Sequence, residues 1–153
     1  MKILMVCLGN ICRSPLAEGV LRHKLAKRNI VAEVDSAGTG SWHVGEQPDY
    51  RAYKVAQKNG IDISKQRARQ LTYGDFAIFD KIYVADREVK DNVMRLAKTN
   101  ADKKKVDFLM NASEPESDRP VPDPYFGGEE GFDHVFTLID EACEKIADMI
   151  SKR

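Results

Sequence analysis

Residues 3–15 read Ile3-Leu4-Met5-Val6-Cys7-Leu8-Gly9-Asn10-Ile11-Cys12-Arg13-Ser14-Pro15. The four apolar residues at the start predict a short buried strand, and the apolar spacing after Pro15 predicts a helix to about residue 28. A cysteine and an arginine therefore bracket a tight loop between a strand and a helix. Such a loop predicts a chemical site.

The loop at residues 7–13 has the features of an anion site. A helix N-terminus carries unpaired N–H groups and a partial positive charge, and a loop leading into it can surround an anion with donors. Gly9 permits a tight turn, and Asn10 tolerates a left-handed backbone. Ser14 is predicted to cap the helix, with Pro15 at its first position.

The side chains of Cys7 and Arg13 indicate which anion is bound. A guanidinium matches two oxygens of a phosphate, and positive surroundings that attract phosphate also favour a nucleophilic thiolate. A buried structural cysteine beside a surface arginine is the alternative, but Gly9 and Asn10 are poor choices for a continuous core element. The 7–13 loop is therefore predicted to be a phosphate-binding loop (P-loop) with a cysteine nucleophile.

Composition restricts the class of protein. The 153 residues suit one domain with a sizeable core. Lys plus Arg and Asp plus Glu each total 24, so the net charge is zero and no basic stripe indicates a nucleic-acid partner. The apolar runs are too short to predict a membrane span. With three cysteines and no signal-peptide pattern, a cytoplasmic location is expected. No cysteine–histidine group has zinc-like spacing, so no metal or other cofactor is expected.

The rest of the chain alternates between strand and helix patterns. Strands are expected at residues 31–36, 81–85 and 106–110, and helices at residues 48–59, 87–100 and 132–150. A strand, a helix and a strand this close together favour a right-handed crossover between parallel strands, which predicts an α/β fold. Asp86 follows a predicted strand, and we interpret it as the cap of the next helix, with a catalytic role as the alternative.

Two irregular segments are candidates to complete the site. Trp42 stands in a polar loop between Gly40 and Gly45, and we interpret it as an aromatic wall beside a pocket rather than as core. Residues 111–131 are rich in proline and glycine, and a loop of this length is usually functional or disordered. In open α/β sheets, sites gather outside the carboxyl ends of the strands, where both Cys7 and the 111–131 loop can lie.

Transfer of phosphate to a thiolate requires a proton donor for the leaving oxygen. Asp123 lies between two prolines that fix its approach, and Tyr125 and Phe126 follow it as aromatics able to flank a phenyl ring. An aspartate of an ordinary turn beside proline is an equally good interpretation of the residues alone.

The string at residues 7–15, this close to the N-terminus, resembles the signature of the low-molecular-weight protein tyrosine phosphatases, and the resemblance extends over nearly the whole chain. It implies a single domain, 1–153, with a three-layer α/β fold. A central, mainly four-stranded parallel sheet in flavodoxin-like order would be flanked by helices on both faces. It also implies a monomeric hydrolase that acts on phosphotyrosine-containing proteins and aryl phosphates. Phosphate or other oxyanions would bind as product or inhibitor.

The resemblance also assigns roles to residues. Cys7 would attack phosphorus, Arg13 would hold the phosphoryl oxygens, and Asp123, in Asp123-Pro124-Tyr125, would be the general acid and then the base when water cleaves the phosphocysteine. Trp42 falls in the family's substrate-specificity loop. The substrate-binding residues implied are Leu8, Gly9, Asn10, Ile11, Cys12, Ser14, Trp42 and Tyr125.

One departure from the family pattern is Gln66, where a histidine often bonds towards the loop. Asn10, Ser14 and Ser36 match the partners of that histidine, and the Gln66 amide, which can donate and accept, would have to replace the imidazole.

Three alternative functions remain. Arsenate reductases on this scaffold need further cysteines, which this chain lacks around residues 87–98; a bond between Cys12 and Cys7 would instead be a reversible protection. Arginine phosphatases typically carry threonine where this chain has Ile11, which favours phosphotyrosine. A non-catalytic phosphate-binding module would need neither Cys7 nor Asp123.

Overall fold

The computed structural model describes residues 1–125 and 129–152. Four parallel strands form one sheet in the order β2-β1-β3-β4. Their bounds are β1 (Lys2–Cys7), β2 (Glu33–Gly38), β3 (Lys81–Val84) and β4 (Val106–Phe108). This order is the flavodoxin-like one, in which the chain reverses direction across the sheet beside β1. The predicted four-stranded parallel sheet is confirmed.

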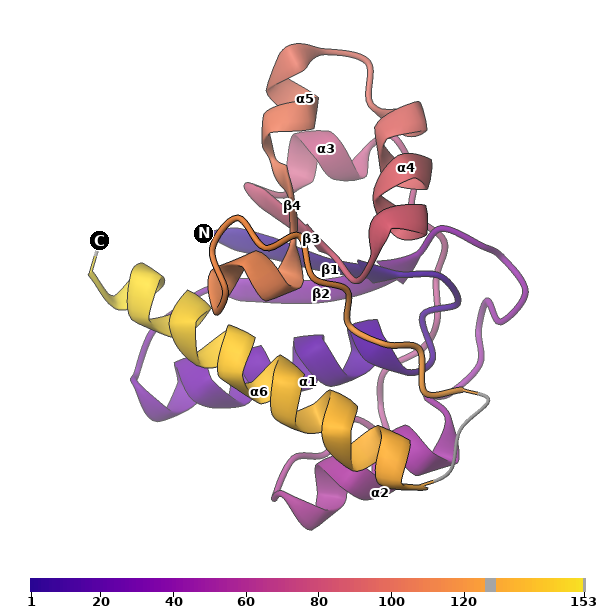
Figure 1. The fold of residues 1–153 in the computed structure, drawn as a ribbon, viewed down its shortest axis with the longest axis vertical. Coiled ribbons are helices and arrows are strands. Elements are labelled where there is room, and N and C mark those ends of the chain that lie inside the picture. The colour runs from indigo at the N-terminus through magenta and orange to yellow at the C-terminus, as the bar shows by residue number, and fades with distance from the viewer. Residues whose placement is uncertain (126–128, 153) are drawn as a thin grey trace.

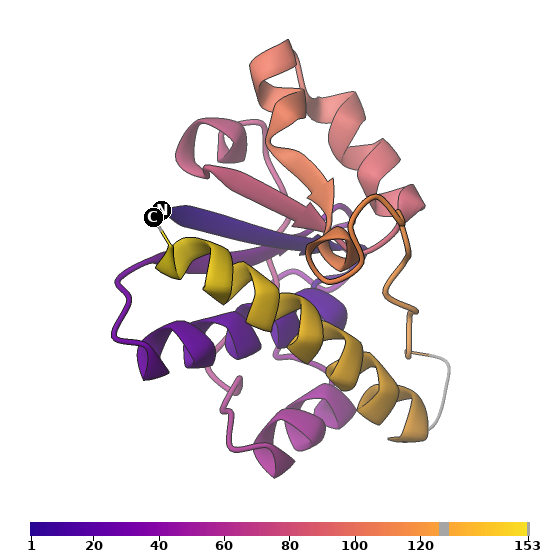
Figure 2. The same cartoon turned by 60° about the vertical axis from the view of Figure 1, so that its left-hand side comes forward.

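Helices cover both faces of the sheet (Figures 1 and 2). One face is covered by α1 (Arg13–Lys27) and α6 (Glu129–Ser151), and α2 (Tyr50–Lys58) packs against these two helices on the side away from the sheet. The other face carries α3 (Asp75–Ile78), α4 (Arg87–Leu96) and α5 (Asn100–Lys104). A short 3-10 helix, η1 (Leu109–Ala112), follows β4. Among the described helices, none is both long and apolar enough to cross a membrane.

The pleat of β1 explains why its sequence is continuously apolar. Ile3 and Met5 belong to the core beneath α1 and α6, whereas Leu4 and Val6 belong to the core beneath α3 and α4. A parallel strand buried on both faces needs apolar side chains at every position, not at alternate ones. Because β1 lies between β2 and β3, its carboxyl end opens at the middle of the sheet edge.

Several boundaries differ from the sequence predictions, among them the end of the strand predicted at 106–110, where η1 begins at Leu109, and two of the differences have a clear physical reason. The second strand begins at Glu33 rather than at residue 31, because Glu33 pairs with Lys2 at the start of β1, and Val31 is 97% exposed. The helix predicted over 87–100 is two helices: α4 ends at Leu96, and Thr99 opens α5 with a capping box. The Thr99 side chain accepts from a backbone N–H three residues on, which begins a new helix rather than extending the old one.

Candidate active site

The site lies where four strands end at one edge of the sheet. Cys7 is the last residue of β1, and the 7–13 loop leads from it into α1. Trp42 follows β2, Asp86 follows β3 and Asp123 follows β4. The parallel arrangement therefore brings segments that are far apart in the sequence to one place, the edge at which α/β sheets bind ligands.

Asn10 holds the conformation of the loop. Its φ of 58° is the left-handed one that its residue type tolerates. The Asn10 Oδ1 accepts from the backbone N–H of Arg69 at 2.9 Å, and its Nδ2 donates to Ser14 Oγ at 2.8 Å and to Ser36 Oγ at 3.0 Å. Both hydrogens and the oxygen of one buried amide thus tie the loop to α1, to β2 and to the backbone of Arg69.

The sulfur of Cys7 is surrounded by donors. The backbone N–H of Asn10 donates to it at 3.3 Å, and Ser14 Oγ lies 2.9 Å away. The prediction that Ser14 caps the helix is wrong: α1 begins at Arg13, with Cys12 at the N-cap position and no side-chain cap among the described residues. Because Ser14 is already inside the first turn, its hydroxyl is directed at Cys7 instead, and the helix N–H groups stay available to a ligand.

Arg13 is 4% exposed and reaches the same cavity from the start of α1. Its Nη1 donates to Asp86 Oδ2 at 2.6 Å and to the carbonyl of Val121 at 2.9 Å, and its Nη2 lies 3.8 Å from Asp123 Oδ2. Burial opposes the charge on Arg13, but Cys7, Asp86 and Asp123 together outweigh burial, so the pKa of the guanidinium is raised and it remains charged.

Asp86 serves two purposes. It caps α4 as predicted, because its Oδ1 accepts from the backbone N–H of Val89 at 2.9 Å, and its Oδ2 orients Arg13. The sequence interpretation missed this second contact. The available signal was the position of Asp86 at the carboxyl end of a strand next to β1.

A cavity of about 150 Å³ opens over the sulfur. Its lining is Cys7, Leu8, Gly9, Ile11, Cys12, Arg13, Trp42, His43, Asp123 and Tyr125. Of the residues that the sequence proposed for the site, Asn10 and Ser14 are not in this lining and instead support it from behind. His43 was not proposed, although it is adjacent to Trp42. Its Nδ1 lies 2.9 Å from Glu46 Oε2, and its ring lies against Gly9, where an added Cβ would be 3.1 Å from Cδ2.

Asp123 fits both interpretations that the sequence left open. Its Oδ1 accepts from the backbone N–H of Tyr125 at 3.0 Å, as in an aspartate turn, while its Oδ2 faces Arg13. The side chain is 41% exposed, so water and substrate can reach it. Arg51 holds the end of this turn, because its Nη2 donates to the carbonyl of Tyr125 at 2.7 Å. Phe126, also named as a flanking aromatic, lies outside the described residues.

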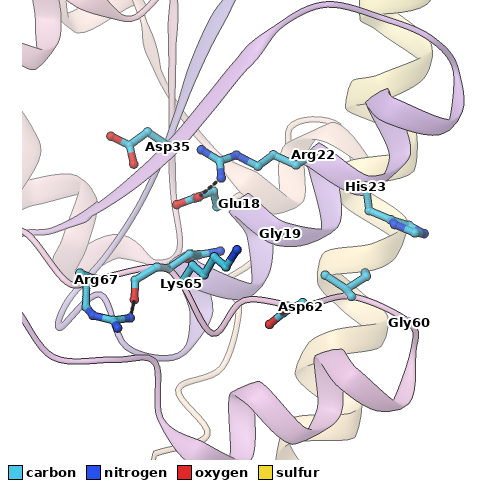
Figure 3. Close-up of a pocket in the computed structure, with 11 residues that line it drawn as sticks. Glu18, Gly19, Arg22, His23, Asp35, Gly60, Asp62, Lys65 and Arg67 are labelled. Carbon is cyan, nitrogen blue, oxygen red and sulfur yellow. Dashed lines mark hydrogen bonds and ion pairs between the residues drawn. The ribbon is translucent and has the colours of Figure 1, made fainter.

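Behind the loop, the hydrogen bonds continue to a buried carboxylate. Ser36 Oγ donates to Glu18 Oε1 at 2.7 Å, and Arg22 pairs with Glu18 Oε2 at 3.0 Å at the side of a separate cleft of about 580 Å³ (Figure 3). Burial raises the pKa of Glu18, against the opposing effects of Ser36 and Arg22.

Gln66 does not take the place expected of it. Its Nε2 donates to the carbonyl of Pro15 at 3.1 Å, and within residues 1–125 and 129–152 its buried Oε1 has no partner. No hydrogen bond to Asn10, Ser14 or Ser36 is formed by its side chain in the described structure. Ser36 bonds to Glu18 instead, so the loop is tied to α1 through a carboxylate.

Fold and site together define an α/β protein with a Cys-x5-Arg loop at the carboxyl edge of a parallel sheet. The family model described as "Low molecular weight phosphotyrosine protein phosphatase" matches residues 2–153. A protein of that name from Schizosaccharomyces pombe is 43% identical over 91% of this chain and 90% of its own length. The chain belongs to this family, and the predictions of the family, its fold and its enzymatic nature are confirmed.

Solved structures agree with this assignment. The protein tyrosine phosphatase from Entamoeba histolytica, whose crystal structure has Hepes in the active site, superposes with a TM-score of 0.92 at 34% identity, covering 99% of this chain and 97% of that one. A drosophila arginine phosphatase superposes with a TM-score of 0.86, also at 34% identity, covering 97% of each chain.

Proposed function

We propose that this protein hydrolyses phosphotyrosine in proteins through a phosphocysteine intermediate on Cys7. The observation that carries the proposal is that a thiol, a guanidinium and an exposed carboxylate line one cavity of about 150 Å³. The family name and the names of the S. pombe and E. histolytica relatives support the substrate class.

Each step follows from the groups present. The phosphoryl oxygens bind to Arg13 and to the N–H groups of the 7–13 loop, which stabilise the charge of the transition state. The sulfur of Cys7 forms a bond to phosphorus as the ester P–O bond breaks, and Asp123 gives its proton to the leaving oxygen. Water then attacks phosphorus, Asp123 takes its proton, and the S–P bond breaks to release phosphate and restore Cys7.

The walls of the cavity favour an aromatic ester. Trp42 and Tyr125 stand at its mouth, and Leu8 and Ile11 add apolar surface closer to the sulfur. A phenyl ring between two aromatic side chains gains contact area and favourable ring–ring geometry. A serine phosphate, with its short linker, would place no group between them.

Phosphoarginine is the second candidate substrate, because the drosophila relative is an arginine phosphatase. The residue that separates the two is Ile11, which lies in the cavity lining. An apolar isoleucine accepts no hydrogen bond from a guanidinium. The threonine that arginine phosphatases typically carry at this position can accept one.

The test compares the wild-type protein with Cys7→Ser on matched phosphotyrosine and phosphoarginine peptides. We expect the wild type to favour phosphotyrosine and an acid quench to trap phosphate on Cys7, detected by peptide mass spectrometry. Cys7→Ser should lose at least about 10³-fold in turnover, because an alcohol is a much weaker nucleophile at neutral pH. Cys143→Ala is the control, because this buried thiol lies on α6 away from the cavity. Unchanged turnover in Cys7→Ser would contradict the mechanism, and a preference for phosphoarginine would contradict the substrate.

A further inference from the structure

Gly40 lies directly beneath the indole of Trp42. A Cβ built on Gly40 would be 1.9 Å from Cζ3, 2.4 Å from Cε3 and 2.7 Å from Cη2 of that indole. Atoms of a real side chain never approach so closely, so the six-membered ring of Trp42 occupies the space in which any other residue would place its side chain.

The backbone of Gly40 is fixed relative to the sulfur of Cys7. Its N–H donates to the carbonyl of Leu8 at 2.9 Å, and the N–H of Thr39 donates to the carbonyl of Cys7 at 3.0 Å. The turn that carries Trp42 is also held at its far end, where the N–H of Gly45 donates to the carbonyl of Ala68 at 2.8 Å. An indole that rests on Gly40 is therefore placed with respect to the reacting atom.

Trp42 separates two cavities. On one side is the cavity over Cys7, and on the other is a cleft of about 400 Å³ that shares Leu8 and Trp42 with it and includes Gly40. Trp42 is 69% exposed. Its resting place on Gly40 therefore decides whether the cavity over Cys7 has a wall on this side.

We propose that Gly40 is a positioning residue: the absence of its side chain seats Trp42 as the wall of the substrate cavity. The consequence for substrate binding rests on the proposed function, whereas the seating of the indole does not. Gly40 lacks the positive φ of Gly45 and Gly60, so alanine at this position brings no backbone strain. The exposed indole can swing into solvent, so the substitution should displace the wall without unfolding the protein.

The experiment uses Gly40→Ala, because Trp42 is the single tryptophan of the chain and reports on itself by fluorescence. We expect increased quenching by acrylamide and lower fluorescence anisotropy, with an unchanged melting temperature. With p-nitrophenyl phosphate as the probe, KM should rise about two- to tenfold, the value of one aromatic contact. The kcat should change by less than about twofold, because Cys7, Arg13 and Asp123 are untouched.

Two controls make the test decisive. Gly74→Ala should be silent in every measurement, since its added Cβ meets only Thr72 Oγ1 at 3.8 Å. If Gly40 acts through the indole alone, Gly40→Ala should have no effect on KM in a Trp42→Ala background. Unchanged fluorescence in Gly40→Ala, or a rise in KM that persists without Trp42, would overturn the proposal. Absence of wild-type activity with a clear fluorescence change would instead refute the proposed function and leave the seating of Trp42 supported.

Discussion

The two carboxylate oxygens of Asp123 have different surroundings. Oδ1 accepts from the backbone N–H of Tyr125, whereas Oδ2 lies 3.8 Å from Arg13 Nη2 in a side chain that is 41% exposed. One oxygen therefore fixes the side chain, and the other has the looser surroundings that the proposed proton transfer needs. A general acid on a loop needs such an arrangement, in which one oxygen positions the carboxyl group and the other can carry the proton.

Replacing Asp123 tests that role. Asp123→Ala should lower kcat by about 10²- to 10⁴-fold for esters of poor leaving groups and much less for activated aryl phosphates, because only a poor leaving group needs the proton. The measurement is kcat across a series of aryl phosphates. Asp123→Asn is the matched control: it keeps the acceptor for Tyr125 but has no proton to give, so it should follow alanine. An equal loss for all leaving groups would argue that Asp123 only shapes the turn.

Among the elements, the junction between β3 and α4 has the most consequence for the site. Asp86 caps α4 with one oxygen and pairs with Arg13 of α1 with the other. Two helices on opposite faces of the sheet are thus joined by a single side chain at the sheet edge. The position of the arginine depends on where a different strand ends.

Asp86→Ala should lower the free energy of unfolding by about 2–4 kcal/mol. The lost cap accounts for about 1 kcal/mol, and the lost hydrogen bond to a charged, buried partner accounts for the rest. Urea denaturation measures the change. Asp86→Asn retains one carbonyl oxygen that can cap α4, whereas its NH2 group cannot accept from Arg13, so it should lose less stability than alanine. Both variants should bind inorganic phosphate more weakly because Arg13 is no longer oriented. A variant with alanine as stable as the one with asparagine would show that α4 does not depend on this cap.

For the whole molecule, the noteworthy feature is a carboxyl group buried between the sheet and α1. Glu18 accepts from Ser36 of β2 and pairs with Arg22, yet burial raises its pKa above that of an ordinary glutamate. The folded protein therefore holds this proton more tightly than the unfolded chain does. Stability from this source is present below the ordinary glutamate pKa of about 4.3 and is lost as pH rises through the raised pKa.

The pH dependence of unfolding tests this assignment. Relative to Glu18→Gln, which keeps an acceptor for Ser36 but cannot ionise, the wild type should lose stability as pH rises from about 4 towards neutrality. Urea denaturation at several pH values gives the difference between the two proteins. A difference that does not vary with pH would mean that ionisation of Glu18 is not linked to folding.

Local sequence patterns were sufficient to predict several elements around the site. The continuous apolar run of β1, the Gly9-Asn10 turn and the helical spacing after Pro15 are properties of neighbouring residues, and each follows from backbone sterics or from burial on two faces. Asp86 as a cap is likewise a contact over three residues. Asp123 was left open because its turn and its proposed chemistry use the same local sequence.

The residues of the chain alone therefore sufficed for the four strands and for the helices α1, α2, α4 and α6 in their order, for the Cys7–Arg13 spacing and for the family resemblance. Tertiary structure decided that Ser14 faces the sulfur rather than capping a helix, that Glu18 rather than Gln66 anchors Ser36, and that Asp86 orients Arg13. The reason is physical: a buried polar group takes whichever partner the packing of distant strands brings within hydrogen-bond distance, and that choice is made between segments far apart along the chain.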